Sequence, residues 1–211
     1  MEWFQQQVTK NDKAPSIDQA TDFFTETLKR HYIPYSELDN LIDRGVAAIK
    51  AYLGVKADSF KPTDKAEVNF RGEGVLIGKA RLAGNIDRME IDKASKTITV
   101  VDFKTGAAYS KWKSDLKLLK YRQQLYFYKL LIEGSHSFQG YRVEAGRLDF
   151  IEPDQDGVIQ SLEIVFDDKE LAELKQLIQA VWQRIIELDL PDTSSYGTSL
   201  TGIKQFMASL Q

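Results

Sequence analysis

The feature that most constrains this chain is a short apolar run with charge on one face, Thr97-Ile98-Thr99-Val100-Val101-Asp102-Phe103-Lys104. β-Branched and aromatic residues dominate the run, and this composition predicts a strand. Side chains alternate between the two faces of a strand, so Asp102 and Lys104 point to the same side. A carboxylate next to apolar residues is costly to bury unless it is paired or binds a cation. The run therefore predicts a polar site on one face of a central strand.

A second carboxylate, Asp87, belongs to the preceding apolar segment, which is expected to form a strand over 79–91. Residues 92–96 have the composition of a hairpin turn, which would bring Asp87 beside Asp102. Two carboxylates and a lysine suit a divalent metal that activates water against a phosphodiester. The plain alternative is an ordinary edge residue at Asp87 and, at Lys104, a lysine that extends its charged end into solvent.

Three motifs stand in order along the chain: Gly84-Asn85-Ile86-Asp87, then Asp102-Phe103-Lys104-Thr105-Gly106, then Gln124-x-x-x-Tyr128. In this order and spacing they resemble the RecB-type nuclease domain, a branch of the PD-(D/E)xK nucleases often found at the C-terminus of UvrD-like DNA helicases. The resemblance covers roughly residues 60–190. It implies a restriction-endonuclease-like core, and the order of predicted elements also favours an α/β fold with a central mixed sheet flanked by helices.

The resemblance also implies roles for the motif residues. Asp87, Asp102 and the backbone carbonyl of Phe103 would be ligands of Mg²⁺ or Mn²⁺. Lys104 would orient the attacking water and neutralise charge.

The same resemblance places Gln124 and Tyr128 beside the active site, where they contact DNA or order the lysine. The two residues are four apart on a predicted helix, so their side chains share a face. The alternative is that this face merely packs on the sheet. Glu67, in the strand before Asp87, is either a supporting acid or a salt-bridge partner of Arg88, and the sequence favours neither.

The histidines depart from the family pattern. Such domains usually carry a metal-binding histidine on a helix ahead of the first strand, and neither His31 nor His136 lies in a matching context. We therefore expect that helix to precede Met1, with residues 2–4 as its trailing turn. The chain would then be the C-terminal piece of a larger helicase-nuclease, with weak activity in isolation.

The function predicted from these features is metal-dependent hydrolysis of DNA phosphodiesters, as an exonuclease on single strands within an ATP-dependent helicase of DNA repair and recombination. The DNA and the helicase domains upstream of Met1 are the expected partners. The alternative is a catalytically weak or inactive DNA-binding module of the same helicase. A sugar or nucleotide metallohydrolase would require more than the two histidines present.

Composition removes several other classes of protein. The 211 residues include no cysteine, which excludes disulfides, thiolate metal sites and iron–sulfur clusters. The chain has no apolar run of membrane-spanning length and no secretory signal, and a reducing cytoplasm is the expected location.

The net charge is −3, but the residues that follow the Asp102 strand are strongly basic. This basic segment predicts a path for a single strand of DNA, whereas the alternative is a solvated helix face. Its members, opposed by Asp115 alone, are Lys104, Lys111, Lys113, Lys117, Lys120, Arg122 and Lys129.

Three regions are expected along the chain: a helical arm over 1–60, the nuclease core over 61–190 and a tail over 191–211. Hydrophobic periodicity and turn residues predict the elements within them. Helices are expected over 16–31, 36–53, 115–133, 167–188 and 203–210, and further strands from 66, over 142–151 and over 161–166. A loop with Tyr109 and Trp112 should follow the Asp102 strand. The long helix over 167–188 should bury one apolar stripe, namely Leu171, Leu174, Leu177, Ile178, Val181, Ile185 and Leu188.

Overall fold

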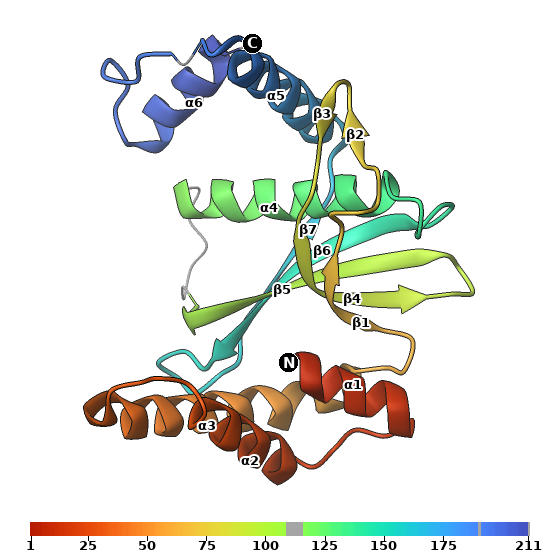
Figure 1. Cartoon of the computed structure of the whole chain (residues 1–211), viewed down its shortest axis with the longest axis vertical. Coiled ribbons are helices and arrows are strands. Elements are labelled where there is room, and N and C mark those ends of the chain that lie inside the picture. The colour runs from red at the N-terminus through yellow and green to blue at the C-terminus, as the bar shows by residue number, and fades with distance from the viewer. Residues whose placement is uncertain (109–115, 190, 211) are drawn as a thin grey trace.

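A computed structural model describes residues 1–108, 116–189 and 191–210 and places a five-stranded sheet between two layers of helices (Figure 1). The neighbouring strands β5 and β6 run parallel, and the other neighbours run antiparallel. The predicted α/β fold with a mixed central sheet is therefore confirmed. In spatial order the strands are β1 (Lys65–Asn69), β4 (Asn85–Asp92), β5 (Thr97–Ala107), β6 (Arg142–Glu152) and β7 (Ser161–Val165).

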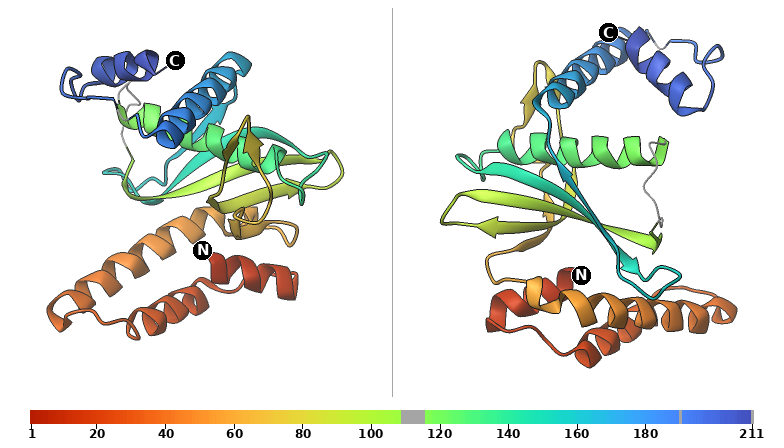
Figure 2. Two further views of the ribbon diagram at one scale, coloured as in Figure 1. Left: turned by 45° about the horizontal axis from the view of Figure 1, so that its top comes forward. Right: turned by 180° about the vertical axis from the view of Figure 1, so that it is seen from behind.

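Three helices form an arm on one face of the sheet, α1 (Glu2–Asn11), α2 (Ile17–Leu28) and α3 (Tyr35–Lys56), with a short 3-10 turn, η1 (Ala57–Ser59). Figure 2 shows that α3 runs along the sheet and that α2 lies against α3. The arm has its own apolar cluster, which includes Phe4, Tyr52, Leu53 and Phe60. Phe103 of β5 packs against this cluster, so the arm is anchored on the strand that carries Asp102.

The other face carries α4 (Leu116–Glu133), and α5 (Asp168–Glu187) and α6 (Leu200–Ser209) lie beyond it (Figure 1). A small hairpin of β2 (Leu76–Ile77) and β3 (Ala80–Arg81) forms a separate sheet that contacts α5. The main core lies between α4 and the sheet and buries Leu125, Leu131, Ile132, Ile86 and Val100 almost completely.

The strand predicted over 79–91 is interrupted, since β3 belongs to the small hairpin and β4 begins only at Asn85. The chain turns between them where α4 passes closely. A Cβ built on Gly84 would stand 3.0 Å from a methyl group of Leu131. The alternation of apolar residues could not reveal this turn, because it depends on a helix far along the chain.

The stripe predicted on α5 is correct only in its first half. Leu171 is buried and Leu174, Ile178 and Trp182 pack against the core, whereas three predicted members, Val181, Ile185 and Leu188, are exposed. α5 contacts α4 and the small hairpin, whose Gly78 lies against Gln179, and beyond Ile178 the core contact comes from Trp182, which the predicted stripe did not include. The predictions for Tyr109, Trp112, Lys111, Lys113 and Asp115 fall outside the described residues.

A buried ion pair ties β4 to the segment that joins the arm to the sheet. The guanidinium of Arg88, wholly buried, donates to Asp64 Oδ2 at 2.8 Å and to the Ser59 carbonyl at 2.6 Å, and it lies over the Phe60 ring. Asp64 in turn accepts backbone N–H groups from Lys61 and Ile91. Removing one partner of such a pair leaves the other charge buried without full compensation.

We therefore expect Asp64→Ala to lower the free energy of unfolding by about 3 kcal/mol, the usual cost of breaking a buried ion pair. Urea denaturation followed by circular dichroism would measure this loss. Asp58→Ala, at an exposed acid in the same segment, is the matched control and should change little. An equal effect of the two substitutions would show that the pair does not hold this junction.

Candidate active site

The two predicted acids meet where β4 and β5 separate. The ladder between these strands pairs Arg88 with Val101, so Asp87 and Asp102 are the next residues on either side. No further pair joins β4 and β5 in the described register, and Asp87 Oδ2 instead accepts the N–H of Phe103 at 2.8 Å. The Asp87 carboxylate of β4 thus accepts a backbone N–H of β5 beyond the last pair of the ladder. This contact fixes Asp87 beside the strand that carries Asp102 and Lys104.

Asp102 is 2% exposed, and side chains from α4 and its own strand surround its carboxylate. Its Oδ1 accepts hydrogen bonds from Gln124 Nε2 at 2.7 Å and from the Tyr128 hydroxyl at 3.0 Å. Lys104 Nζ lies 2.6 Å from Oδ2 and donates to Gln124 Oε1 at 2.7 Å. The structure therefore brings the predicted side chains of both strands and of α4 together in one cluster.

Local geometry explains how these residues meet. Gln124 and Tyr128 are one helical turn apart on α4, and the two side chains are joined by a hydrogen bond of 2.8 Å. Phe103, between Asp102 and Lys104, points to the opposite face and meets Tyr52 of α3 edge to face at 5.7 Å. The alternation of β5 thus separates its charged face from its apolar face, as the sequence predicted.

Tyr121 of α4 adds a further contact to the cluster. The ammonium of Lys104 lies 4.7 Å from the centre of the Tyr121 ring. Tyr121 precedes Gln124 by three residues, so both contact Lys104 from the same face of α4. The helical spacing was visible in the sequence, but the partner across the sheet was not.

Burial and charge shift the acid equilibria of this cluster. Burial raises the pKa of Asp87, and the charge of Asp102 adds to the rise, while the N–H of Phe103 opposes both. Burial also raises the pKa of Tyr128, followed by the charge of Asp102, so its hydroxyl remains a neutral donor.

Glu67 lies close to the acids and adopts an unusual backbone conformation, with φ of +50°. The register between β1 and β4 is the same on both sides of this residue, with Ala66 opposite Arg88 and Val68 opposite Ile86, so Glu67 stands opposite Asp87 without a ladder pair of its own. Burial raises the pKa of Glu67, and repulsion from Asp87 and Glu2 raises it further. Arg88 pairs with Asp64 and Glu90, which leaves the first of the two sequence interpretations, a supporting acid beside Asp87, as the better description.

The donor set suits a hard divalent cation that keeps several waters. In the described part of the chain no three His, Cys, Asp or Glu side chains gather closely enough to hold a metal ion by themselves. However, Asp102 Oδ2 is buried and accepts no hydrogen bond from a described residue, and only the charge of Lys104 balances it. Carboxylate oxygens are the ligands that Mg²⁺ and Mn²⁺ prefer. His31 is exposed between α2 and α3, and His136 lies against Gly74 after the end of α4.

The basic segment is only partly available to a polyanion. Lys129 is 8% exposed and donates to Glu133 at 2.5 Å and to the Val143 carbonyl at 2.8 Å. Arg122 pairs with Glu170 of α5. Lys129 is therefore a structural residue, contrary to the prediction that the whole segment follows DNA.

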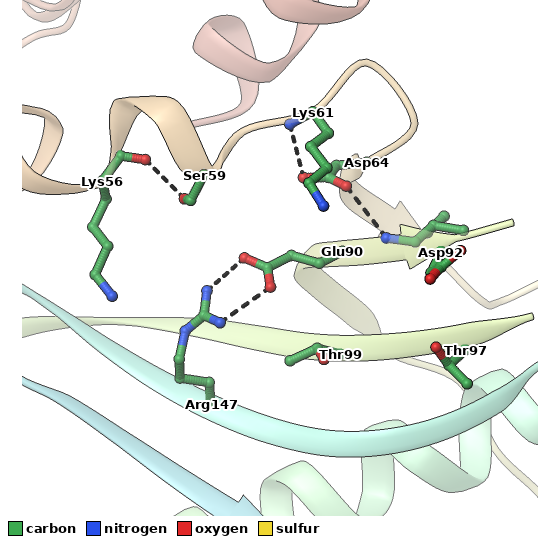
Figure 3. Close-up of a pocket in the computed structure, with 10 residues that line it drawn as sticks. Lys56, Ser59, Lys61, Asp64, Glu90, Asp92, Thr97, Thr99 and Arg147 are labelled. Atoms are coloured by element: carbon green, nitrogen blue, oxygen red, sulfur yellow. Dashed lines mark hydrogen bonds and ion pairs between the residues drawn. The ribbon is translucent and has the colours of Figure 1, made fainter. Parts of the chain in front are cut away.

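A pocket with a volume of about 320 Å³ lies on the opposite face of the sheet (Figure 3). Its charged groups largely satisfy one another. Arg147 contacts both carboxylate oxygens of Glu90, at 2.5 and 3.1 Å, and Asp64 accepts two backbone N–H groups. This pocket belongs to the polar network that joins the arm to the sheet, and the acids of the active-site cluster are not among its lining residues.

A mixed sheet flanked by helices, with two acids and a lysine on adjacent strands, is the arrangement of a restriction-endonuclease-like protein. A family model of the PD-(D/E)XK nuclease superfamily matches residues 1–196. The match spans most of the chain, and the chain therefore belongs to the PD-(D/E)XK nuclease superfamily. A comparison with curated proteins returns no match. Among the described helices, none has the length and apolar character needed to cross a membrane.

Gln124 is the link between the acid and the lysine, so its loss should loosen both. We expect Gln124→Leu to weaken Mn²⁺ binding or DNA cleavage by about 10- to 100-fold, the usual effect of removing a group that orients a metal ligand. Gln123→Leu is the matched control, because Gln123 contacts Met207 of α6 instead. Isothermal titration with Mn²⁺ and a cleavage assay would measure the two effects. Equal behaviour of the two variants would contradict the role given to Gln124.

Proposed function

We propose that this chain is a divalent-metal-dependent deoxyribonuclease that hydrolyses phosphodiester bonds and acts as an exonuclease on single strands. The observation that carries the proposal is the cluster of Asp87, Asp102 and Lys104, in which Gln124 holds both the acid and the lysine. Membership of the nuclease superfamily supports the reaction class.

In the proposed mechanism Asp87, Asp102 and the Phe103 carbonyl would hold Mg²⁺ or Mn²⁺. When bound, the ion supplies Lewis-acid activation of water and of the phosphate. Lys104 would orient the attacking water and stabilise negative charge on the phosphate. Gln124 and Tyr128 hold the Asp102 carboxylate in its orientation, since both donate to its Oδ1.

We further propose that the domain works within an ATP-dependent DNA helicase of repair and recombination, in the cytoplasm, and that the helicase delivers the strand. The motif order supports this context. The first turn of α1 is also relevant, because Glu2 influences the ionisation of Glu67 next to Asp87. Any residues encoded upstream of Met1 would therefore enter beside these acids, where the family's histidine would be useful as a further ligand.

The metal proposal predicts that Mn²⁺ or Mg²⁺ binds and that binding is lost in Asp102→Ala. Binding should also weaken as the pH falls, because the metal competes with a proton on Asp87, whose pKa is raised by burial. Asp92→Ala is a suitable control, since Asp92 is an exposed acid at the end of β4. Isothermal titration of the three proteins at several pH values measures these effects. If wild type and Asp102→Ala bind alike, the metal lies elsewhere.

The catalytic proposal predicts that Lys104→Ala leaves the fold and metal binding nearly intact but slows cleavage by about 10²- to 10³-fold, as for other positioned groups that stabilise a transition state. Binding of DNA should weaken much less, because phosphate contacts are distributed over many cations. Digestion of an end-labelled oligonucleotide with Mn²⁺ measures the rate.

The same assay decides between an enzyme and a binding module. It should include a form of the protein extended upstream by several tens of residues where the coding sequence allows. Cleavage by either form that depends on Lys104 supports the nuclease. If both forms bind the strand and neither cuts it, the chain is a DNA-binding module of the same helicase.

A further inference from the structure

The connection between α2 and α3 carries two tyrosines that contact almost nothing. Tyr32 and Tyr35 are 108% and 92% exposed, the highest values among the exposed large hydrophobic side chains of the described residues. Aromatic side chains are costly to leave in water, and their π-faces are the platforms on which unpaired bases stack. The mechanism proposed above does not use this pair.

The sequence around the tyrosines is basic, and the connection is held firmly. Lys29, Arg30 and His31 precede Tyr32 directly, and no acid occurs between Leu28 and Ser36. The Ile33 N–H bonds to the His31 carbonyl at 2.9 Å, and Pro34 is the residue at which α3 begins. Proline fixes its own φ and restricts the residue before it, so the two rings stand on a stiff turn.

The arm lies on the face of the sheet opposite to α4 and the Asp102 cluster, but the α2–α3 connection lies at the same edge of the molecule as the end of β5. The views in Figures 1 and 2 all place the end of β5 and the α2–α3 connection on the same side. Arg44 of α3 forms an ion pair with Glu152 at 2.7 Å, and Glu152 also accepts the N–H of Gly106, two residues after Lys104. The arm is thereby tied to the strand that carries the catalytic lysine.

The length of α3 gives the reach of this arrangement. Tyr35 precedes Arg44 by nine residues of the same helix, which corresponds to about 14 Å along its axis. At about 3.4 Å per stacked nucleotide this distance equals roughly four nucleotides. This is the span from the connection to the Arg44–Glu152 contact, and the path from Glu152 through Gly106 to Lys104 adds to it.

We propose that Tyr32 and Tyr35 form a base-stacking platform for single-stranded DNA, with Arg30 contacting a phosphate. Lys29 is paired with Glu26 at 3.3 Å. This inference rests on the proposed cleavage of single strands and adds the surface that would bind their unpaired bases. Acids such as Glu26 and Glu37 flank the connection, so stacking rather than charge supplies most of the affinity there.

The test measures binding separately from cleavage. Fluorescence anisotropy of a short end-labelled oligothymidylate, in EDTA so that nothing is cut, gives the affinity of the full chain. We expect Tyr32→Ala/Tyr35→Ala to bind at least about 10-fold more weakly, the usual effect of losing a stacked base. Tyr32→Phe/Tyr35→Phe keeps the rings and should bind like wild type. Leu188→Ala, at another strongly exposed apolar residue but on α5, is the control and should also be neutral.

Two further measurements identify the ligand and the type of contact. A blunt duplex of the same length should bind wild type and the double alanine variant equally, because paired bases offer no free faces. The dependence of affinity on salt should be unchanged in the double alanine variant, whereas Arg30→Ala should reduce the slope by about one contact.

The outcomes separate this inference from the proposed function. Equal binding of the oligonucleotide by wild type and the double alanine variant overturns the platform and leaves the surface for a protein partner, even if cleavage is normal. Loss of binding in that variant supports the platform, even if no form of the protein cuts DNA with Mn²⁺. A similar loss in the phenylalanine variant would also overturn it, since the rings would then be irrelevant.

Discussion

The structure depends on the burial of one carboxylate in the middle of the sheet. Asp102 lies in a strand whose neighbours are apolar, and leaving such a group in the interior requires donors and a positive charge close by. Two donors from α4 and the ammonium of Lys104 provide them. The position of α4 on the sheet is therefore tied to the chemistry, because a shift of α4 would leave Asp102 with only the lysine. The contacts of Asp102 with α4 and Lys104 thus serve both the stability of the sheet and the proposed chemistry.

The opposite face of β5 imposes a matching constraint. Phe103 packs on Tyr52, and the Tyr52 hydroxyl donates to Asp149 of β6 at 2.7 Å. Arg147 and Ser161 complete the environment of Asp149, which is wholly buried. The helical arm is consequently part of the scaffold that positions β5, the strand that carries Asp102 and Lys104. This explains why the arm is bound by buried polar contacts as well as by its apolar cluster.

The part of this molecule that the sequence predicts well is the part governed by local alternation and short spacing. Asp102 and Lys104 on one face, and Gln124 with Tyr128 one turn apart, follow from the periods of a strand and a helix. The predictions that failed concern features that depend on residues far away in the sequence. The break before Asn85 arises where α4 passes over the chain, and on α5 the core contact comes from Trp182 while Ile185 is exposed. The positive φ of Glu67 was not visible in the sequence either.

The number of Lys and Arg residues in a segment is a weak guide to a nucleic-acid-binding surface, because some of them form ion pairs within the fold. Two cations of the basic segment are consumed within the fold, Lys129 by Glu133 and a backbone carbonyl, and Arg122 by Glu170. The net charge of the chain is −3, so each cation that is paired within the fold weakens non-specific attraction of a strand. Contacts that do not need charge would compensate, and the exposed rings of Tyr32 and Tyr35 are proposed as such contacts. Delivery of the strand by an attached motor would complement the same deficit, because a delivered strand need not be captured from solution.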